Sequence, residues 1–320
     1  MLSPSTAQDQ HTACALRRNR RAAGVLDSEG RAARSLTRAR PGIPMPQTFL
    51  VATDLSPRAD RAVQRAFRLA GWVGADLVLV SVIDADLPAE IAGQMSSAAE
   101  LRLAQFAASI PHSGEVTHDT RVVLGDPTEA IPALAAELDA ALVILGLHRP
   151  RAFLDMLRET TMERIVRHSP RPVLLVRDPV DHAYATVLAA LDFAPASDAA
   201  LALAAQLAPE ADIHGLHALH VPYRGFLAPE PAPGTPSPLR ADAEARLAGW
   251  RDRHALPANL RSVEIVEGPA HRVLAERIAA LDPDLIALGA HGRAGAAPSI
   301  LGSLANDMMR DPPCDLLIAR

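Results

Sequence analysis

The sequence contains no lysine, and its 32 basic residues are all arginines. A P-loop nucleotide site requires the lysine of its Walker A motif, so this absence excludes that class of protein. Aromatic residues make up only 3% of the chain, which argues against stacking platforms for nucleic acid. The two cysteines, Cys14 and Cys314, lie at opposite ends of the sequence and form neither a disulfide framework nor a zinc motif. No apolar run approaches the roughly 20 residues of a membrane-spanning helix, so we expect a cytoplasmic protein without a membrane partner.

The net charge of −5 is unevenly distributed. Residues 1–46 contain eight arginines and three acidic residues, and they end in the run Pro41-Gly-Ile-Pro-Met-Pro46. We expect a disordered extension that is dispensable for folding, with Met45 as an alternative start of the natural chain. A basic arm for nucleic acid or anionic lipid and a targeting peptide are the competing interpretations. A secretory signal is excluded because the segment has no apolar core.

The rest of the chain repeats itself. An apolar run that ends in aspartate, Phe49–Asp54, recurs as Thr186–Asp192, and each is followed by a helix-like stretch. Two pairs of glycines then recur at a spacing of 143 residues, namely Gly125 with Gly268 and Gly146 with Gly289. Such periodicity indicates two copies of one fold. We therefore predict domains at residues 47–178 and 179–320, with a breaker at Asp178-Pro179.

Within each copy, short apolar runs alternate with helical stretches. Runs rich in Val, Leu and Ile are typical of strands that are covered on both faces, and the alternation predicts a parallel α/β sheet. The copies close with the strands Val173–Val176 and Leu316–Ala319. Ligands of such folds bind beyond the carboxyl ends of the strands.

The second copy has its glycines and an aspartate at those strand ends. Gly289, Gly292, Gly302 and Ser303 form the pattern G-x2-G-x9-G-S, and Asp192 ends the first strand of this copy. Glycine lets backbone amides approach a phosphate, and Ser303 is placed to cap the following helix, whose start attracts anions. The alternative is that the glycines only make turns and that Asp192 caps the next helix. The combination in a βαβ context favours a site.

These motifs resemble the universal stress protein family in its tandem form. The resemblance implies two Rossmann-like domains of the adenine nucleotide alpha hydrolase type, each a five-stranded parallel sheet flanked by helices. It implies a stress-response or regulatory protein that binds ATP or another adenine nucleotide, with Mg²⁺ as an open addition. It also suggests dimers through the last strand, so the two closing strands could pair within one chain as a pseudo-dimer, or with a second chain in a homodimer. By the same resemblance, Asp192 would face the adenosine and the Val221 backbone would meet the adenine. The ribose and phosphates would contact the loop, in which His291 is a ligand contact or shapes the backbone; the loop residues are Gly289, His291, Gly292, Gly302 and Ser303.

The first copy departs from this pattern. Arg149 stands in place of Gly292, Glu159 in place of Gly302, and Thr160 in place of Ser303. An arginine side chain crowds the loop, and a carboxylate lies where phosphates are expected. Although Asp54 and Val82 are kept, we predict that only the second copy binds nucleotide and that the first is a pseudo-site.

Other chemistry finds little support. His214, His217 and His220 are spaced so that, on a strand, the outer two lie about 20 Å apart and cannot chelate one metal. The Pro-rich stretch Pro222–Pro238 is interpreted as a loop. No motif supplies a nucleophile or general base, so we expect no catalytic or metal-binding residues and at most slow ATP hydrolysis. A non-nucleotide interaction or dimerisation module of the same fold is the main alternative, and an enzyme acting on a nucleotide-activated substrate is a weaker one.

Overall fold

The computed structural model describes residues 47–56, 59–147, 160–177, 179–180, 182–220, 238–291 and 301–320. The predicted extension at residues 1–46 and most of the predicted Pro-rich loop lie outside the described residues. We call residues 47–177 the first repeat and residues 182–320 the second repeat.

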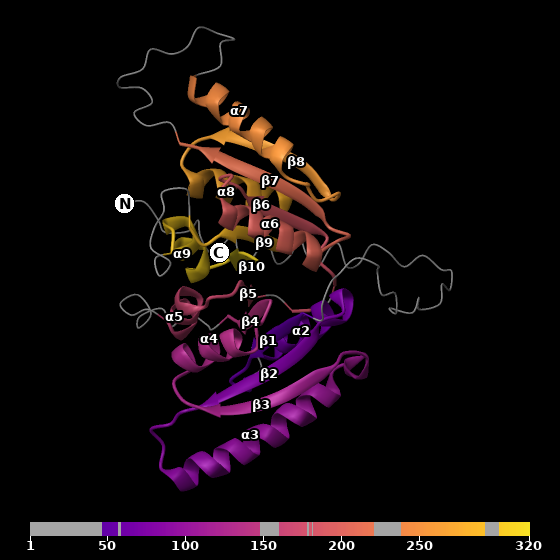
Figure 1. Ribbon diagram of the computed structural model, residues 1–320, viewed down its shortest axis with the longest axis vertical. Helices are drawn as coiled ribbons and strands as arrows, with labels where there is room; N and C mark the ends of the chain where they lie inside the picture. Colours follow the sequence, from indigo (N-terminus) through magenta and orange to yellow (C-terminus); the bar gives the residue numbers. More distant parts are fainter. Residues whose placement is uncertain are drawn as a thin grey trace, which may run out of the picture. The chain divides into compact units, whose positions relative to one another are not determined.

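Each repeat alternates strands and helices, as the sequence predicts (Figure 1). The first repeat comprises β1 (Thr48–Ala52), α2 (Ala59–Val73), β2 (Asp76–Ile83), α3 (Ala89–Ser109), the 3₁₀ turn η1 (Ser113–Glu115), β3 (His118–Leu124), α4 (Pro127–Glu137), β4 (Leu142–Gly146), α5 (Thr161–His168) and β5 (Val173–Val176). The second comprises β6 (Thr186–Ala190), α6 (Pro195–Leu207), β7 (Asp212–Leu219), α7 (Pro238–Arg253), β8 (Leu260–Glu267), α8 (Ala270–Leu281), β9 (Leu285–Gly289), α9 (Ser303–Arg310) and β10 (Asp315–Ala319).

The strands form one ten-stranded sheet in the order β3-β2-β1-β4-β5-β10-β9-β6-β7-β8. Within each repeat all five strands are parallel, which confirms the predicted fold class. The two closing strands pair with each other and are antiparallel, with Leu316 opposite Leu175. The order of strands reverses between β1 and β4 and again between β6 and β9, and such switch points are where ligands bind in open α/β sheets.

Helices cover both faces of the sheet, which explains why the strands are apolar on both sides. Helices α2, α3, α6 and α7 contribute to one buried cluster, and helices α4, α5, α8 and α9 contribute to the other. Successive strand residues alternate between the clusters: Phe49 and Val51 belong to the first, Leu50 to the second. Within the described part of the chain, no helix combines the length and apolar character that crossing a membrane requires.

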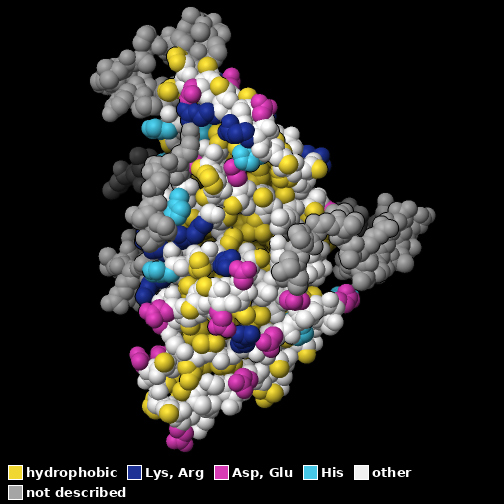
Figure 2. Space-filling model, viewed as in Figure 1, with side chains coloured by type: hydrophobic (Ala, Val, Ile, Leu, Met, Phe, Trp, Pro, Cys, Tyr) yellow, Lys and Arg dark blue, Asp and Glu magenta, His cyan; other side chains and the backbone are white. Residues whose placement is uncertain are grey.

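The surface carries charges of both signs. On the face shown in Figure 2, acidic and basic side chains of the described residues are interspersed rather than gathered by sign. The described residues of this face therefore present no broadly positive surface to an anionic ligand.

The junction between the repeats contains a buried ionic cluster. The Asp315 carboxylate, which is fully buried, lies 3.1 Å from Nε of Arg65 in α2. It also accepts hydrogen bonds from the Tyr184 hydroxyl (2.7 Å) and the Arg177 amide (2.7 Å). The Arg65 guanidinium stacks 4.4 Å from the centre of the Tyr184 ring. Burial, followed by the charge of Asp315, raises the pKa of Tyr184 well above its ordinary value, so the phenol stays a donor.

Candidate functional site

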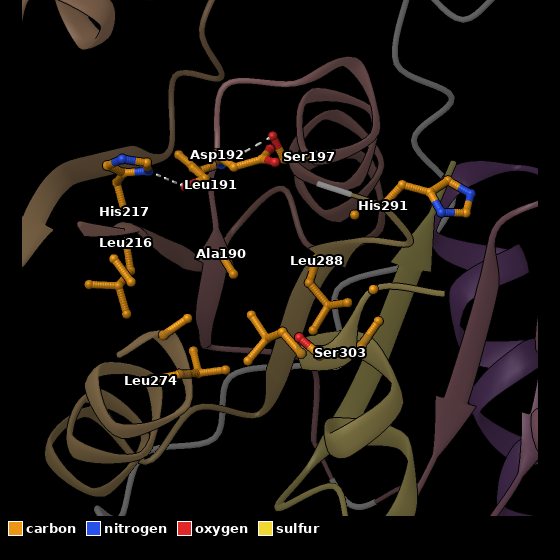
Figure 3. Close-up of a pocket in the computed structure, with 16 residues that line it drawn as sticks. Ala190, Leu191, Asp192, Ser197, Leu216, His217, Leu274, Leu288, His291 and Ser303 are labelled. Atoms are coloured by element: carbon orange, nitrogen blue, oxygen red, sulfur yellow. Dashed lines mark hydrogen bonds between the residues drawn. The ribbon is translucent and has the colours of Figure 1, made fainter. Parts of the chain in front are cut away.

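A cavity of about 380 Å³ opens at the carboxyl ends of the second repeat's strands, beside the switch point between β6 and β9 (Figure 3). This volume lies within the range of small-molecule sites. Its walls come from the ends of β6, β7 and β9 and from the starts of α6, α8 and α9; they are formed by Ala190, Leu191, Asp192, Ser197, Leu216, His217, Ala218, Ala270, Leu274, Leu288, Gly289, His291, Gly302, Ser303, Leu304 and Ala305.

The cavity has an apolar interior and a few polar groups. Leu216, Leu274 and Leu288 point toward one another across it in Figure 3, whereas Asp192 and Ser197 lie together at one side. An apolar surface with a few convergent polar groups suits a flat organic ring that carries polar substituents.

Asp192 follows β6, where its position is fixed by local hydrogen bonds. Its carboxylate accepts from the amide of Ala194 at 3.1 Å, and its own amide lies 3.4 Å from Oγ of Ser197. Phe193, between Asp192 and Ala194, adopts a left-handed conformation with φ of 61°. Leu55, which follows Asp54 in the first repeat, has φ of 59°, so both repeats use the same turn. This turn precedes α6, whose N-cap is Ala194 and not Asp192.

His217 is a lining residue that the sequence indicated only as a rejected metal ligand. It is buried in β7, and its Nδ1 donates to the Leu191 carbonyl at 2.7 Å, because a carbonyl oxygen can only accept. Its ring lies 4.7 Å from the Phe193 ring, which in turn lies 5.5 Å from Trp250. The imidazole is therefore held against the end of β6, next to Asp192.

The expected adenine contact at Val221 lies outside the described residues. Strand register identifies a different counterpart of Val82: Thr48 pairs with Asp76 in the first repeat, and Thr186 pairs with Asp212 in the second. Six residues farther along, Val82 therefore corresponds to Ala218, which lines the cavity. The sequence contains two successive Leu-His steps, at 216–217 and 219–220, and by register the first of them corresponds to Val80-Ser81. The contact expected at Val221 stays a prediction.

The glycines of the loop have distinct structural roles. A Cβ on Gly289 would lie 2.9 Å from the Ser197 amide nitrogen, so this glycine allows β9 to approach the first turn of α6. Gly302 is the N-cap of α9, and a Cβ there would meet only the Ala290 carbonyl at 3.5 Å. Gly292 lies outside the described residues.

Ser303 does not cap α9 as the sequence suggested. It is the first residue of the helix and is exposed, and α9 has no side-chain cap because its N-cap is Gly302. The equivalent residue of the first repeat, Thr160, is the N-cap of α5 and precedes that helix. Helix α9 therefore begins one residue earlier in its repeat than α5 does. Ser303 nevertheless lines the cavity.

His291 lies at the edge of the cavity with its ring directed away from the other lining side chains (Figure 3). Its Nε2 is 3.4 Å from the guanidinium of Arg320, and its buried Nδ1 has no hydrogen-bond partner among the described residues. Of the two roles considered, this orientation favours the shaping of the loop.

Three helix starts that border the cavity carry no side-chain cap. The N-caps are Ala194 for α6, Pro269 for α8 and Gly302 for α9, and none of them accepts a hydrogen bond through its side chain. The first amides of a helix lack partners within the helix and carry partial positive charge. The starts of α8 and α9 therefore favour an anionic group in the cavity, whereas the start of α6 already has the Asp192 carboxylate on the Ala194 amide.

Two of the corresponding helix starts in the first repeat, those of α4 and α5, are closed by that repeat's own side chains. At α4, Asp126 accepts from the amide (2.7 Å) and the hydroxyl (2.6 Å) of Thr128, and these bonds lower the pKa of Asp126. At α5, Thr160 and Glu163 form a capping box: the Glu163 amide donates to Thr160 Oγ1, and the Thr160 amide donates to the Glu163 carboxylate. Gly146 ends β4, Asp54 is exposed, and Arg149 and Glu159 lie outside the described residues.

The described residues provide no metal centre of their own. No group of three or more His, Cys, Asp or Glu side chains among them is arranged to hold a metal ion. His214 and His217 lie in β7, and His220 follows its end. Asp192 is the acidic residue among those that line the cavity.

Comparison with known proteins agrees with the repeat and the fold. The model of the universal stress protein family matches the chain twice, over residues 45–177 and 183–320. A universal stress protein of Mycolicibacterium smegmatis is 27% identical over 291 residues, which cover 85% of this chain and 96% of that protein. One from Mycobacterium tuberculosis is 27% identical over 210 residues, covering 63% and 68%. The crystal structure of a universal stress protein from Archaeoglobus fulgidus matches with a TM-score of 0.63 and 20% identity, covering 85% of this chain and 98% of that chain. The chain belongs to the universal stress protein family, with two copies of the family's domain in tandem.

Proposed function

We propose that the second repeat binds an adenine nucleotide, with ATP as the first candidate, and that the first repeat is a pseudo-site. The observation that carries the proposal is the cavity at the β6/β9 switch point, where an apolar interior meets the starts of α8 and α9, which have no side-chain caps. Apolar walls suit the base, and helix starts suit phosphates.

The arrangement of the lining residues suggests how the nucleotide lies. The base would occupy the apolar region near the Ala218 backbone, and the Asp192 carboxylate would accept hydrogen bonds from ribose hydroxyls. The phosphates would lie toward Gly302 and Ser303 at the start of α9. Mg²⁺ would accompany the phosphates and be held mainly by them, since Asp192 is a single carboxylate and magnesium sites use few protein ligands.

Thermal unfolding of the full chain with ATP, AMP, GTP and no ligand tests this proposal. A ligand that binds only folded protein raises its stability by RT ln(1 + [L]/Kd), so ATP should raise Tm progressively with concentration, and GTP should do so much less. Absence of any shift at millimolar ATP would reject the proposal and favour an interaction module of the same fold. Product analysis after long incubation would detect hydrolysis.

Tryptophan fluorescence offers a site-specific readout. Trp250 is linked to the cavity through Phe193 and His217, at ring separations of 5.5 and 4.7 Å. Replacing Trp72 of α2 by Phe leaves Trp250 as the single tryptophan. ATP should change the emission of this variant in a saturable way. If ATP raises Tm but leaves the emission unchanged, ATP binds outside this cavity.

A further inference from the structure

Arg320, which follows β10, connects the second repeat's cavity to the first repeat. Its Nη1 lies 3.4 Å from Nε2 of His291, a residue that lines the cavity. Its Nη2 donates to the carbonyls of Val166 (3.0 Å) and Arg167 (2.6 Å) in the last turn of α5. The side chain therefore contacts both repeats at once.

The contact with α5 is electrostatically favourable and fixes the guanidinium. The last carbonyls of a helix lack partners within the helix and carry partial negative charge, which attracts a cation. Burial lowers the pKa of Arg320 from its ordinary value, but arginine remains charged at neutral pH. The planar guanidinium can donate to these carbonyls and to an imidazole simultaneously, which a lysine ammonium on a flexible stem does less well.

The contact with His291 acts on the turn after β9. A guanidinium only donates, so Nε2 of His291 is the acceptor, and Arg320 is the partner of this ring within the described part of the chain. The neighbouring Ala290 amide donates to the Ala319 carbonyl (2.7 Å), and the Gly302 amide donates to the Ala290 carbonyl (2.8 Å). Arg320 and Ala319 thus hold His291 and Ala290, which follow the cavity wall at Gly289, and Ala290 in turn contacts the N-cap of α9.

We propose that Arg320 is a positioning residue for the site in the second repeat, and that helix α5 of the first repeat is the fixed point from which it acts. This inference rests on the proposed nucleotide site. It gives the first repeat a role, because α5 of that repeat holds the arginine that contacts His291 in the second repeat. Arg320 is not among the residues that line the cavity, whereas His291 is, so the arginine acts on the site through His291 and not by contact with the ligand.

The sequence repeat supplies a matched control. Arg177 follows β5 as Arg320 follows β10, and its side chain also crosses the junction, donating to the Pro313 carbonyl. Arg177 is not among the residues that line the cavity. Arg320→Ala and Arg177→Ala therefore both remove an arginine from the junction, but only the first removes support from the loop.

The test combines ATP titration with amide hydrogen exchange of the full chain. Arg320→Ala should weaken ATP binding about tenfold, the cost of losing a charged hydrogen bond. Arg320→Lys should recover part of this loss, and Arg177→Ala should stay within about twofold of the wild type. ATP should also slow exchange in the last turn of α5 in the wild type but not in Arg320→Ala.

Exchange without nucleotide separates this inference from the proposed function. Arg320→Ala should speed exchange of the Ala290 and Gly302 amides in the ligand-free protein, whereas Arg177→Ala should leave them unchanged. Unchanged exchange at these amides, or wild-type ATP affinity in Arg320→Ala, would overturn the inference. If wild-type protein binds no ATP but the exchange difference is seen, the positioning role stands and the proposed nucleotide function fails.

Discussion

The two repeats share one topology but treat the starts of their equivalent helices in opposite ways. In the first repeat, the Asp126 carboxylate accepts from the Thr128 amide in the first turn of α4. At α5, Thr160 Oγ1 accepts from the Glu163 amide, and the Glu163 carboxylate accepts from the N-cap amide of Thr160. In the second, the N-caps of α8 and α9 are Pro269 and Gly302, which offer no side-chain acceptor. A helix start can be satisfied by an internal carboxylate or left available to an external anion. The same fold therefore yields a self-capped repeat and a repeat suited to anions.

The junction is also asymmetric, and breaking it should have the largest effect. Asp315 at the start of β10 is buried beside Arg65, whereas the equivalent position before β5 is Pro172. Asp315→Ala leaves a buried cation without its carboxylate, so we expect the free energy of unfolding to fall by about 3–5 kcal/mol. Urea denaturation measures this. Asp212→Ala, which removes an exposed ion pair with Arg261, serves as control and should change stability by under about 1 kcal/mol. A similar small change in both variants would show that the junction cluster contributes little.

Giving the second repeat a carboxylate like those of the first should weaken its proposed binding of ATP. Gly302→Asp places the carboxylate at the N-cap of α9, where a Cβ is sterically tolerated. We expect ATP affinity to fall on the order of a hundredfold through like-charge repulsion, while stability rises by roughly a few tenths of a kcal/mol. Calorimetric titration and thermal unfolding measure the two effects.

The uncharged cap Gly302→Ser is the matched control for this substitution. It should give a similar gain in stability but keep most of the ATP affinity. Equal loss of affinity in both variants would mean that the space at Gly302, and not the absence of charge, is what the ligand requires.

The two described glycines of the loop should differ in how much stability depends on them. Gly289→Ala brings a Cβ within 2.9 Å of the Ser197 amide nitrogen, so the start of α6 must shift, and we expect a loss of about 1–3 kcal/mol. The nearest atom to a Cβ on Gly302 is 3.5 Å away, so Gly302→Ala should cost much less. Chemical denaturation measures the free energy of unfolding of both variants. Equal losses in the two would contradict the difference expected between these glycines.

The smallest effect concerns acid sensitivity in the first repeat. Hydrogen bonds from Thr128 lower the pKa of Asp126, so its contribution to stability is complete above the unfolded-state pKa of about 3.9 and is lost as pH falls through the lower folded-state pKa. Asp126→Asn retains a capping oxygen but cannot titrate. Its stability should therefore fall less steeply than that of the wild type between about pH 4 and pH 2. Parallel slopes in denaturation at these pH values would show that the capping carboxylate is not acid-labile.

Much of the fold could be predicted from the sequence because the strand runs, the recurring glycines and the Asp-terminated strands are local signals. The strands Val173–Val176 and Leu316–Ala319 appear where expected, although their mutual pairing could not be decided before the structure. The site was predicted less well. Ala218 and His217 were missed because the second repeat contains two Leu-His steps, at 216–217 and 219–220, and either could be aligned with the second strand of the first repeat. Only the pairing of β7 with β6 decides between the two alignments.

The contrast between the repeats also lay beyond the sequence comparison, which judged the first repeat by Arg149 and Glu159. Whether a residue caps a helix depends on backbone dihedral angles at one position, and a shift of one residue moved the cap of α9 from Ser303 to Gly302. The long-range contacts of Arg320 had no local signal at all.

The stoichiometry of ATP binding tests the central contrast most directly. Isothermal titration of the full chain should give one nucleotide per chain for the wild type and none for Gly302→Asp at the same concentrations. Two nucleotides per wild-type chain, or one retained by Gly302→Asp, would contradict the assignment of binding to the uncapped helix starts of the second repeat.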